Sequence, residues 1–392
     1  MRPFSTIVVF LVLACCPGLG LSQAARTAPE LVELGVLELG KARYDKAVDA
    51  FREAVRLNPS MVAAHRGLGQ TFTALGATRN AVACFQEAVR LDPSDAQSFL
   101  ELGNAYLALR LAREAIAAYQ EAITLRPKLV PAHLALGNAY SMAGPLEEAI
   151  ASYERVIAID PALADAHANL GMSYRRLGKD EAAMQAFQKA IRFNPHVPGL
   201  YSMLGDTYSD LSRYAEAVDC LNQLGRMEHP SESLYRRRGF LNLYLSRGDA
   251  AAEDGRACLQ LLGWHAEASQ FMALLAHFGY RQAKRPEDAA RILDEAASQA
   301  DRSRWPYPVF QHLRGELDGK ELLRRSINND ELTEAHGYAG LDLALKGKTA
   351  EALEHFSWVR EYGNRHFVEY HFALAELERI EKSGTSSASE PK

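Results

Sequence analysis

Three histidines recur at one place in a 34-residue period, at His65, His133 and His167. Imidazole is a common zinc ligand, so a row of histidines raises the question of a metal site. Zinc holds its nitrogen ligands at about 2.1 Å, whereas the axes of packed helices lie about 8–10 Å apart. Histidines on neighbouring helices are therefore expected to be half-buried packing residues. We expect no metal and no other cofactor.

Polar side chains of another kind follow the same period. Asn104 and Asn138 lie 34 residues apart, and the pair Arg175-Arg176 follows one period later. Asparagines in a row can hydrogen-bond an extended peptide backbone without requiring a particular sequence. Arginine adds bidentate capture of a carboxylate. These residues predict peptide binding.

Catalytic and nucleic-acid motifs are missing from the sequence. It contains no phosphate-binding glycine loop, dinucleotide pattern, Gly-x-Ser-x-Gly turn or His-Glu-x-x-His. The net charge is −5, from 44 basic and 49 acidic residues, which predicts no nucleic-acid partner. We expect no enzyme. The alternative is a hydrolase or transferase whose site lies within residues 258–330, where His265, His277 or Glu316 would converge on a pocket.

A leucine-glycine pair positions these side chains. It recurs six times at a spacing of 34 residues, at Leu34-Gly35, Leu68-Gly69, Leu102-Gly103, Leu136-Gly137, Leu170-Gly171 and Leu204-Gly205. A proline keeps the same step, at Pro59, Pro93, Pro127, Pro161 and Pro195, and Pro230 comes one residue late. A fixed period of this length indicates a repeat architecture.

Each period predicts two helices. In residues 96–129 the first apolar stripe has helical spacing and consists of Phe99, Leu102, Gly103 and Tyr106. The second stripe is Ala115, Tyr119 and Ala122, and Pro127 ends it because proline lacks an amide donor. Glycine inside a helix costs about 1 kcal/mol relative to alanine. Six glycines in register therefore indicate that the two helices cross closely.

Residues 28–231 resemble six tetratricopeptide (TPR) repeats. The small residue that begins the second stripe is Ala47, Ala81, Ala115, Ala149, Ala183 and Ala217. The aromatic after it is Phe51, Phe85, Tyr119, Tyr153 and Phe187, and Leu221 departs from the pattern. The resemblance implies an all-α, right-handed TPR solenoid that binds a protein or peptide along a concave groove.

In such a stack the first helix of each repeat lines the groove. The groove residues that this implies are Arg66, Gln70, Asn104, Asn138, Met172, Arg175, Arg176 and Asp206. The groove would run from apolar Val32 and Val36 to a basic step at Arg175-Arg176 and an acidic end at Asp206 and Asp210. Two alternatives remain. One is a clamp for a carboxyl terminus, for which the lysines are missing, and the other is a merely solvated polar surface.

The pattern weakens after Pro230. Residues 232–300 are expected to form degenerate TPR-like helices, and 301–330 to form a break rich in Trp, Pro and Gly. Residues 331–381 are expected to hold a last repeat and a capping helix, and 382–392 a disordered tail. A structural homo-oligomer that docks through this half is a further alternative.

Part of this half has a narrower resemblance. Trp305, Val309, Gly315 and Leu322 resemble the C-terminal part of bacterial NlpI-type outer-membrane lipoproteins. So does the stretch 334–377, with Tyr338, Gly347, Ala352, Phe356 and the run Phe367-Val368-Glu369-Tyr370. That family consists of TPR adaptors for envelope proteases and peptidoglycan hydrolases. The resemblance implies an envelope adaptor.

The N-terminus predicts export. Arg2, an apolar run from Ile7 to Cys16 and the small-residue site Ser22-Gln23-Ala24 form a signal peptide over residues 1–24. Alternatively, Val12-Leu13-Ala14-Cys15 resembles a lipoprotein cleavage box, which would leave Cys15 as a lipid anchor in the membrane. The protein would then be periplasmic or secreted, or anchored. Cys84, Cys220 and Cys258 are expected to be unpaired core residues.

Overall fold

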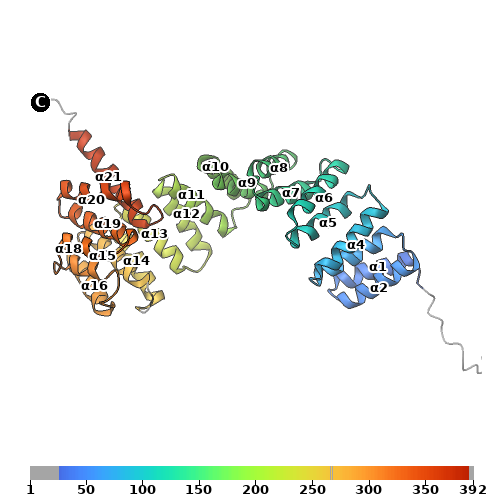
Figure 1. Cartoon of the computed structure of the whole chain (residues 1–392), viewed down its shortest axis with the longest axis horizontal. Coiled ribbons are helices and arrows are strands. Elements are labelled where there is room, and N and C mark those ends of the chain that lie inside the picture. Colours follow the sequence, from blue (N-terminus) through green and yellow to red (C-terminus); the bar gives the residue numbers. More distant parts are fainter. Residues whose placement is uncertain (1–25, 265, 267, 388–392) are drawn as a thin grey trace, which may run out of the picture. The chain divides into compact units, whose positions relative to one another are not determined.

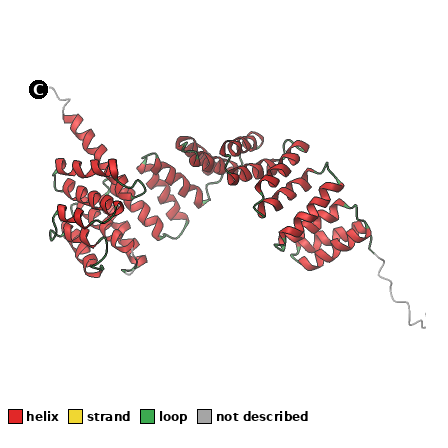
Figure 2. Cartoon of the chain, in the orientation of Figure 1, coloured by secondary structure: helices red, strands yellow, loops and turns green. Residues whose placement is uncertain are grey.

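The computed structural model describes residues 26–264, 266 and 268–387. The expected signal peptide, Cys15 and His265 lie outside these residues. Within them the chain forms helices joined by short loops, and no strand (Figure 2). This confirms the predicted all-α repeat fold. The helices are α1 Ala28–Gly40, α2 Tyr44–Leu57, α3 Val62–Ala74, α4 Thr78–Leu91, α5 Ala96–Ala108, α6 Ala112–Leu125, α7 Val130–Ala143, α8 Leu146–Ile159, α9 Ala164–Arg176, α10 Asp180–Phe193, α11 Pro198–Asp210, α12 Tyr214–Met227, α13 Glu232–Tyr244, α14 Gly248–Leu262, α15 Ala268–Gln282, α16 Pro286–Gln299, α17 Tyr307–Leu313, α18 Gly319–Arg325, α19 Asn329–Leu345, α20 Thr349–Tyr362 and α21 Val368–Ser387 (Figure 1).

The chain divides into two compact units after Pro161. The first unit contains α1 to α8, which form four helix pairs. The second unit contains α9 to α21. Each predicted repeat from residue 28 to 227 is one such pair, so the period in the sequence and the period in the structure coincide.

The turn inside each pair uses a left-handed residue at the same repeat position. These residues are Ala42, Gly76, Arg110, Gly144, Gly178, Ser212 and Ser246. The next helix begins two residues after each of them, for example α2 at Tyr44 and α4 at Thr78. Glycine adopts this conformation without steric cost, so Gly76, Gly144 and Gly178 are the residues best suited to it.

The glycines inside the first helices lie against the aromatics of the second helices, as predicted. An ideal Cβ built on Gly103 would lie 2.5 Å from Cε1 of Tyr119, and one on Gly171 would lie 2.8 Å from Cε1 of Phe187. Tyr119 and Phe187 are both fully buried. The sixth pair differs, because the nearest atom to a Cβ on Gly205 is Cβ of Cys220 at 3.4 Å. Leu221 replaces the aromatic there and leaves this extra room.

Consecutive repeats are joined by a hydrogen bond that also recurs every 34 residues. A glutamine amide on a second helix donates to a tyrosine hydroxyl on the following first helix. The bonds are Gln86 to Tyr106 at 2.8 Å, Gln120 to Tyr140 at 3.0 Å and Gln188 to Tyr208 at 2.7 Å. The aligned amides and hydroxyls therefore contribute to the registration of one pair on the next.

The repeated histidine position has a polar role in addition to packing. Nε2–H of His65 donates to the carbonyl of Pro59 at 2.9 Å, and His133 makes the same bond to Pro127. The hydroxyl of Tyr201, at the same repeat position, donates to the carbonyl of Pro195 at 3.2 Å. The ring thus ties the start of one repeat to the proline turn that precedes it.

The second unit departs from a simple stack after α16. The expected break at 301–330 contains two short helices, α17 and α18, which pack against each other and against α19. The chain then returns to a helix pair, α19 and α20. The final helix begins at Val368, as expected, but continues to Ser387, into the stretch expected to form the tail.

The final helix, α21, packs on more than the last pair. It contacts α19 and α20, and it also contacts α13, which lies more than 100 residues earlier in the chain. The hydroxyl of Tyr244 at the end of α13 donates to the carbonyl of Val368 at 3.1 Å. Phe372, Ala373 and Leu377 of α21 are buried in the core. The second unit therefore closes on itself.

The remaining sequence expectations concern cysteines and membranes. Cys84, Cys220 and Cys258 are free thiols, and burial raises the pKa of each to about 11. They are therefore protonated and unreactive near neutral pH. None of the helices described here is both long enough and apolar enough to span a bilayer.

Candidate peptide-binding site

A polar pocket lies in the first unit between the first helices of the second and third repeats, α3 and α5. It has a volume of about 350 Å³. Two of the predicted groove residues, Gln70 and Asn104, line it together. The other lining residues are Thr73, Thr78, Phe85, Gln97, Glu101, Ala105 and Ala108. The pocket thus lies on the surface that the sequence assigned to the ligand.

Glu101 provides an open acceptor in this pocket. Its Oε1 accepts from the amides of Gln70 at 2.8 Å and Gln97 at 3.1 Å. Its Oε2 is buried and has no hydrogen-bond partner. A buried acceptor left unpaired costs about 1–3 kcal/mol, so a ligand N–H at this oxygen would recover that free energy. The sequence analysis did not single out Glu101.

Asn104 is held by an aromatic residue of its own repeat. The hydroxyl of Tyr119 donates to Oδ1 of Asn104 at 2.8 Å. Burial raises the pKa of Tyr119, so its hydroxyl remains a donor. Because Oδ1 is the accepting atom in this bond, the Asn104 side chain is oriented with its amide nitrogen as the donor toward a ligand. In the fourth repeat the hydroxyl of Tyr153 donates to Asn138 at 2.7 Å.

The asparagine and the tyrosine occur together in the sequence. The two repeats with tyrosine at the aromatic position, Tyr119 and Tyr153, are the two with asparagine 15 residues earlier. Repeats with phenylalanine there have Val36, Gln70 or Met172 at the groove position. A spacing of 15 between a polar groove residue and a hydroxyl was thus the sequence signal for this support.

Arg66 is engaged within the protein. Its Nη1 donates to Oδ2 of Asp95 at 2.7 Å, and the same oxygen accepts from the hydroxyl of Ser98 at 2.6 Å. Asp95 also caps the N-terminus of α5. The Asp95 carboxylate therefore neutralises the guanidinium, so Arg66 positions α3 against α5 in this state and is not an open anion site.

The remaining predicted groove residues belong to the second unit and neutralise one another. Arg175 forms ion pairs with Asp206 at 3.7 Å and Asp210 at 2.9 Å, and Arg237 also bonds to Asp206. The expected basic step and acidic end are therefore one charge network. Arg176 is exposed at the end of α9, and Met172 is 38% exposed.

The C-terminal helix covers part of this surface. Asp206 and Asp210 line a pocket of about 190 Å³ together with Val368 and His371 of α21. The sequence predicted an open acidic end of the groove at this place. The structure differs because α21 packs against α13.

The residues named for the hydrolase alternative also come together. His277 and Glu316 line a pocket of about 480 Å³ in the second unit. The described residues that line it include no serine, threonine or cysteine. Glu316 is paired with Arg314, and burial lowers the pKa of His277 to about 4. A histidine with this pKa is a weak base, so this pocket offers neither a nucleophile nor an efficient general base.

Comparisons with known proteins support the repeat assignment. Family models described as "Tetratricopeptide repeat" match residues 32–96, 71–130, 164–197 and 198–224, and one described as "TPR repeat" matches residues 142–174. A comparison with curated protein sequences gave no match.

Several solved structures are similar to parts of the chain. MamA is 28% identical with a TM-score of 0.40, over 41% of this chain and 95% of its own. YrrB, described as a TPR protein with an unusual peptide-binding site, is 25% identical with a TM-score of 0.39, over 43% of this chain and 87% of its own. A TPR protein from Parabacteroides merdae is 18% identical with a TM-score of 0.47, over 64% and 98%.

All three TM-scores are below 0.5, so the family assignment rests on the repeat models and on the recurring geometry. The models cover the stretch in which each 34-residue period forms one helix pair with its glycine against the following aromatic, or against Cys220 in the sixth pair. Together these findings show that the chain is a tetratricopeptide-repeat protein.

Proposed function

We propose that this protein is a non-catalytic scaffold that binds an extended peptide segment of a partner protein in the polar pocket between α3 and α5. The observation that carries the proposal is the pairing of Glu101 with Asn104 in that pocket. Glu101 Oε2 lacks a donor, and the Asn104 amide is oriented as a donor. One acceptor and one donor side by side match the N–H and C=O of a peptide backbone.

The mechanism is pre-organisation of the binding surface. Gln70 and Gln97 hold Glu101, and Tyr119 holds Asn104, before any ligand arrives. A ligand therefore does not have to immobilise these side chains, which lowers the entropic cost of binding. Contacts to the backbone alone would admit different sequences, as expected of an adaptor.

We further propose that the protein is exported and acts as an envelope adaptor for proteases or cell-wall hydrolases. The support is the apolar, cleavable N-terminal segment together with the NlpI-like residues from Trp305 to Leu377. Export is tested by N-terminal sequencing and mass analysis of the protein from the cell envelope. A chain that begins after Ala24, or at a lipid-modified Cys15, supports the proposal, and one that retains Met1 in the cytoplasm contradicts it.

The double variant Glu101→Gln, Asn104→Ala is expected to lose its partners. Each substitution removes one hydrogen bond to the ligand, worth about 1 kcal/mol, so enrichment of the partner should fall at least tenfold. The measurement is quantitative crosslinking and affinity capture from cells that express either form. Glu121→Ala, an exposed change on α6 of the same repeat, is the matched control and should capture the native set. Equal capture by native protein and double variant would contradict the proposed site.

Tyr119→Phe is expected to weaken binding without touching the ligand. It removes only the hydroxyl that orients Asn104, so affinity for a captured peptide should fall about threefold to tenfold. The measurement is isothermal titration of that peptide into native and variant protein. Asn104→Ala should make the further change Tyr119→Phe silent, because the oriented group is then gone. An equal loss from Tyr119→Phe in both backgrounds would show that the hydroxyl acts through stability and not through Asn104.

A further inference from the structure

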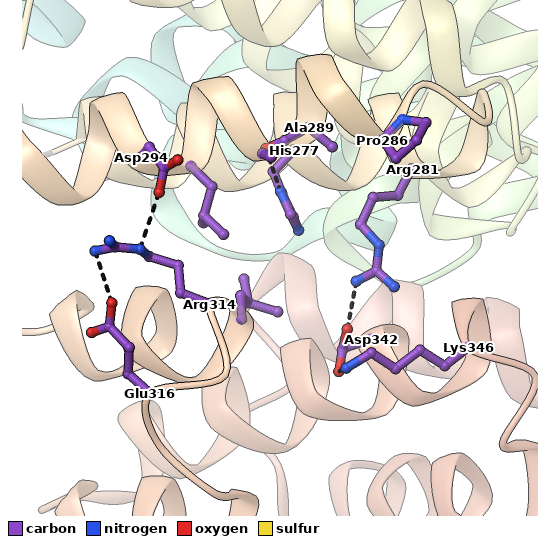
Figure 3. Close-up of a pocket in the computed structure, with 12 residues that line it drawn as sticks. His277, Arg281, Pro286, Ala289, Asp294, Arg314, Glu316, Asp342 and Lys346 are labelled. Carbon is purple, nitrogen blue, oxygen red and sulfur yellow. Dashed lines mark hydrogen bonds and ion pairs between the residues drawn. The ribbon is translucent and has the colours of Figure 1, made fainter.

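The largest pocket described above lies in the second unit, away from the α3–α5 site. It has a volume of about 480 Å³ and is bounded by α15, α16, α19 and the end of α17 (Figure 3). This volume is within the range of small-ligand sites, about 300–1,000 Å³. Its apolar lining consists of Pro286, Ala289, Ala290, Leu293 and Leu313.

His277 places one bare acceptor in this pocket. The side chain is 5% exposed, and Nδ1–H donates to the carbonyl of Ala289 at 2.8 Å. A carbonyl can only accept, so Nδ1 bears the proton and Nε2 is the acceptor. Nε2 is buried without a hydrogen-bond partner, and Figure 3 shows the ring directed from α15 into the space between the helices. Burial lowers the pKa of His277 to about 4, which keeps the ring neutral.

Two balanced ion-pair groups flank His277. On one side Asp342 accepts from Arg281 at 2.5 Å and from Lys346 at 2.8 Å. On the other side Arg314 contacts Asp294 and Glu316, both at 3.1 Å (Figure 3). Each group contains its own counter-ions, and together they contain three cations and three anions. A ligand with a net charge would therefore gain little from them, and it would have to displace an existing pair.

From this arrangement we infer that the pocket binds a neutral secondary amide with an apolar side chain, namely one peptide unit of a partner segment. Its N–H would donate to Nε2 of His277, and its apolar side chain would lie on Leu293 and Leu313. Its carbonyl would accept from Lys346 or Arg314, which are 54% and 35% exposed. Because the ligand is taken to be a peptide, this inference rests on the proposed function, but it uses none of the α3–α5 residues.

The alternative occupants are distinguished by chemistry. An anion would favour the cations over their carboxylate partners, and an ammonium group would favour Asp294 or Glu316. Neither would supply a donor to His277 without disturbing an ion pair. A neutral amide satisfies the buried acceptor and leaves both ion-pair groups intact.

The test uses the whole chain labelled with ¹⁵N-histidine and the probe N-acetyl-leucine methylamide. The matched probe is its fully N-methylated analogue, which has the same carbonyls and side chain but no N–H. We expect the amide to shift the His277 ring nitrogens and to bind about tenfold more tightly than the methylated probe, the factor for one hydrogen bond. Binding by N-acetyl-leucine or leucine methylamide, which are charged, should be weaker than binding by the neutral amide.

Two variants complete the test. His277→Gln retains an acceptor and should bind within about threefold of the native protein, whereas His277→Leu should lose about tenfold. Equal binding of the two neutral probes, tighter binding of a charged probe, or no shift of His277 would each overturn the inference. The methylated probe needs no variant, so the result stands even if His277→Leu fails to fold. Glu101→Gln, Asn104→Ala should not change the shift, which separates failure here from failure of the α3–α5 site.

Discussion

Gly171→Ala is expected to destabilise the second unit by about 1–3 kcal/mol. The new methyl would lie 2.8 Å from Cε1 of Phe187, which is fully buried and cannot move aside without disturbing α9 and α10. Overpacking of a filled core typically costs this amount. The measurement is urea unfolding followed by circular dichroism, with the midpoint compared at constant slope.

The sequence supplies matched controls for this prediction. Gly205→Ala, one repeat later, places its methyl 3.4 Å from Cys220, and Gly199→Ala meets no atom within 4 Å. Both are helical, so alanine should be neutral or stabilising by up to about 1 kcal/mol. Phe187→Leu should relieve part of the cost of Gly171→Ala in the double variant. If all three glycines responded alike, steric contact with the aromatic would not be the cause.

Glu334→Gln is expected to stabilise the second unit at alkaline pH by at least about 2 kcal/mol, or roughly 4–8 °C in Tm. Glu334 is 6% exposed and Glu369 of α21 is 1% exposed. Their neutral donors are Trp305 for Glu334 and Tyr338 for Glu369. Burial, together with the charge of Glu369, raises the pKa of Glu334 to about 8, and burial raises the pKa of Glu369 to about 7. Glutamine retains the shape and removes the charge.

The sign follows from proton binding. Both carboxyls hold their protons more tightly in the folded state than in the unfolded state. Their contribution is therefore fully present below about pH 4.5 and is lost as the pH rises toward 8. Native protein and Glu334→Gln should thus have similar stability near pH 4.5 and diverge up to pH 8.5.

Buried histidines act in the opposite direction over a lower range. Burial and the neighbouring His355 lower the pKa of His336 to about 4, so stability falls as the pH drops below about 6.5. Thermal scans from pH 4.5 to 8.5 should show both limbs in the native protein. Exposed Glu354→Gln is the control and should leave the alkaline limb unchanged. An alkaline limb of native slope in Glu334→Gln would contradict this assignment.

The repeat fold followed from the sequence because its cause is local and periodic. A glycine such as Gly103 inside an apolar stripe costs helix propensity, so its recurrence indicated the close helix crossing that the structure contains. The groove residues Gln70 and Asn104 were placed by the same register and line one pocket. Periodicity could supply this much because each repeat packs in the same way as the one before.

What the sequence did not predict depends on contacts without a fixed period. The unpaired oxygen of Glu101 results from the bonds made by Gln70 and Gln97, which come from two helices. The network of Arg175 and Asp206 looked like two separate charges along a groove. The contact of Tyr244 with Val368 joins positions 124 residues apart, and no repeat spacing indicates it.

That last contact separates the two units in how they can change during evolution. In the first unit every helix contacts only near neighbours along the chain, so duplication or loss of one 34-residue repeat alters the length and leaves each interface intact. In the second unit α13 and α21 meet, so an added repeat between them would pull the final helix off its seat. The number of repeats can therefore drift at the N-terminal end, whereas the C-terminal end is inherited as a unit of fixed size.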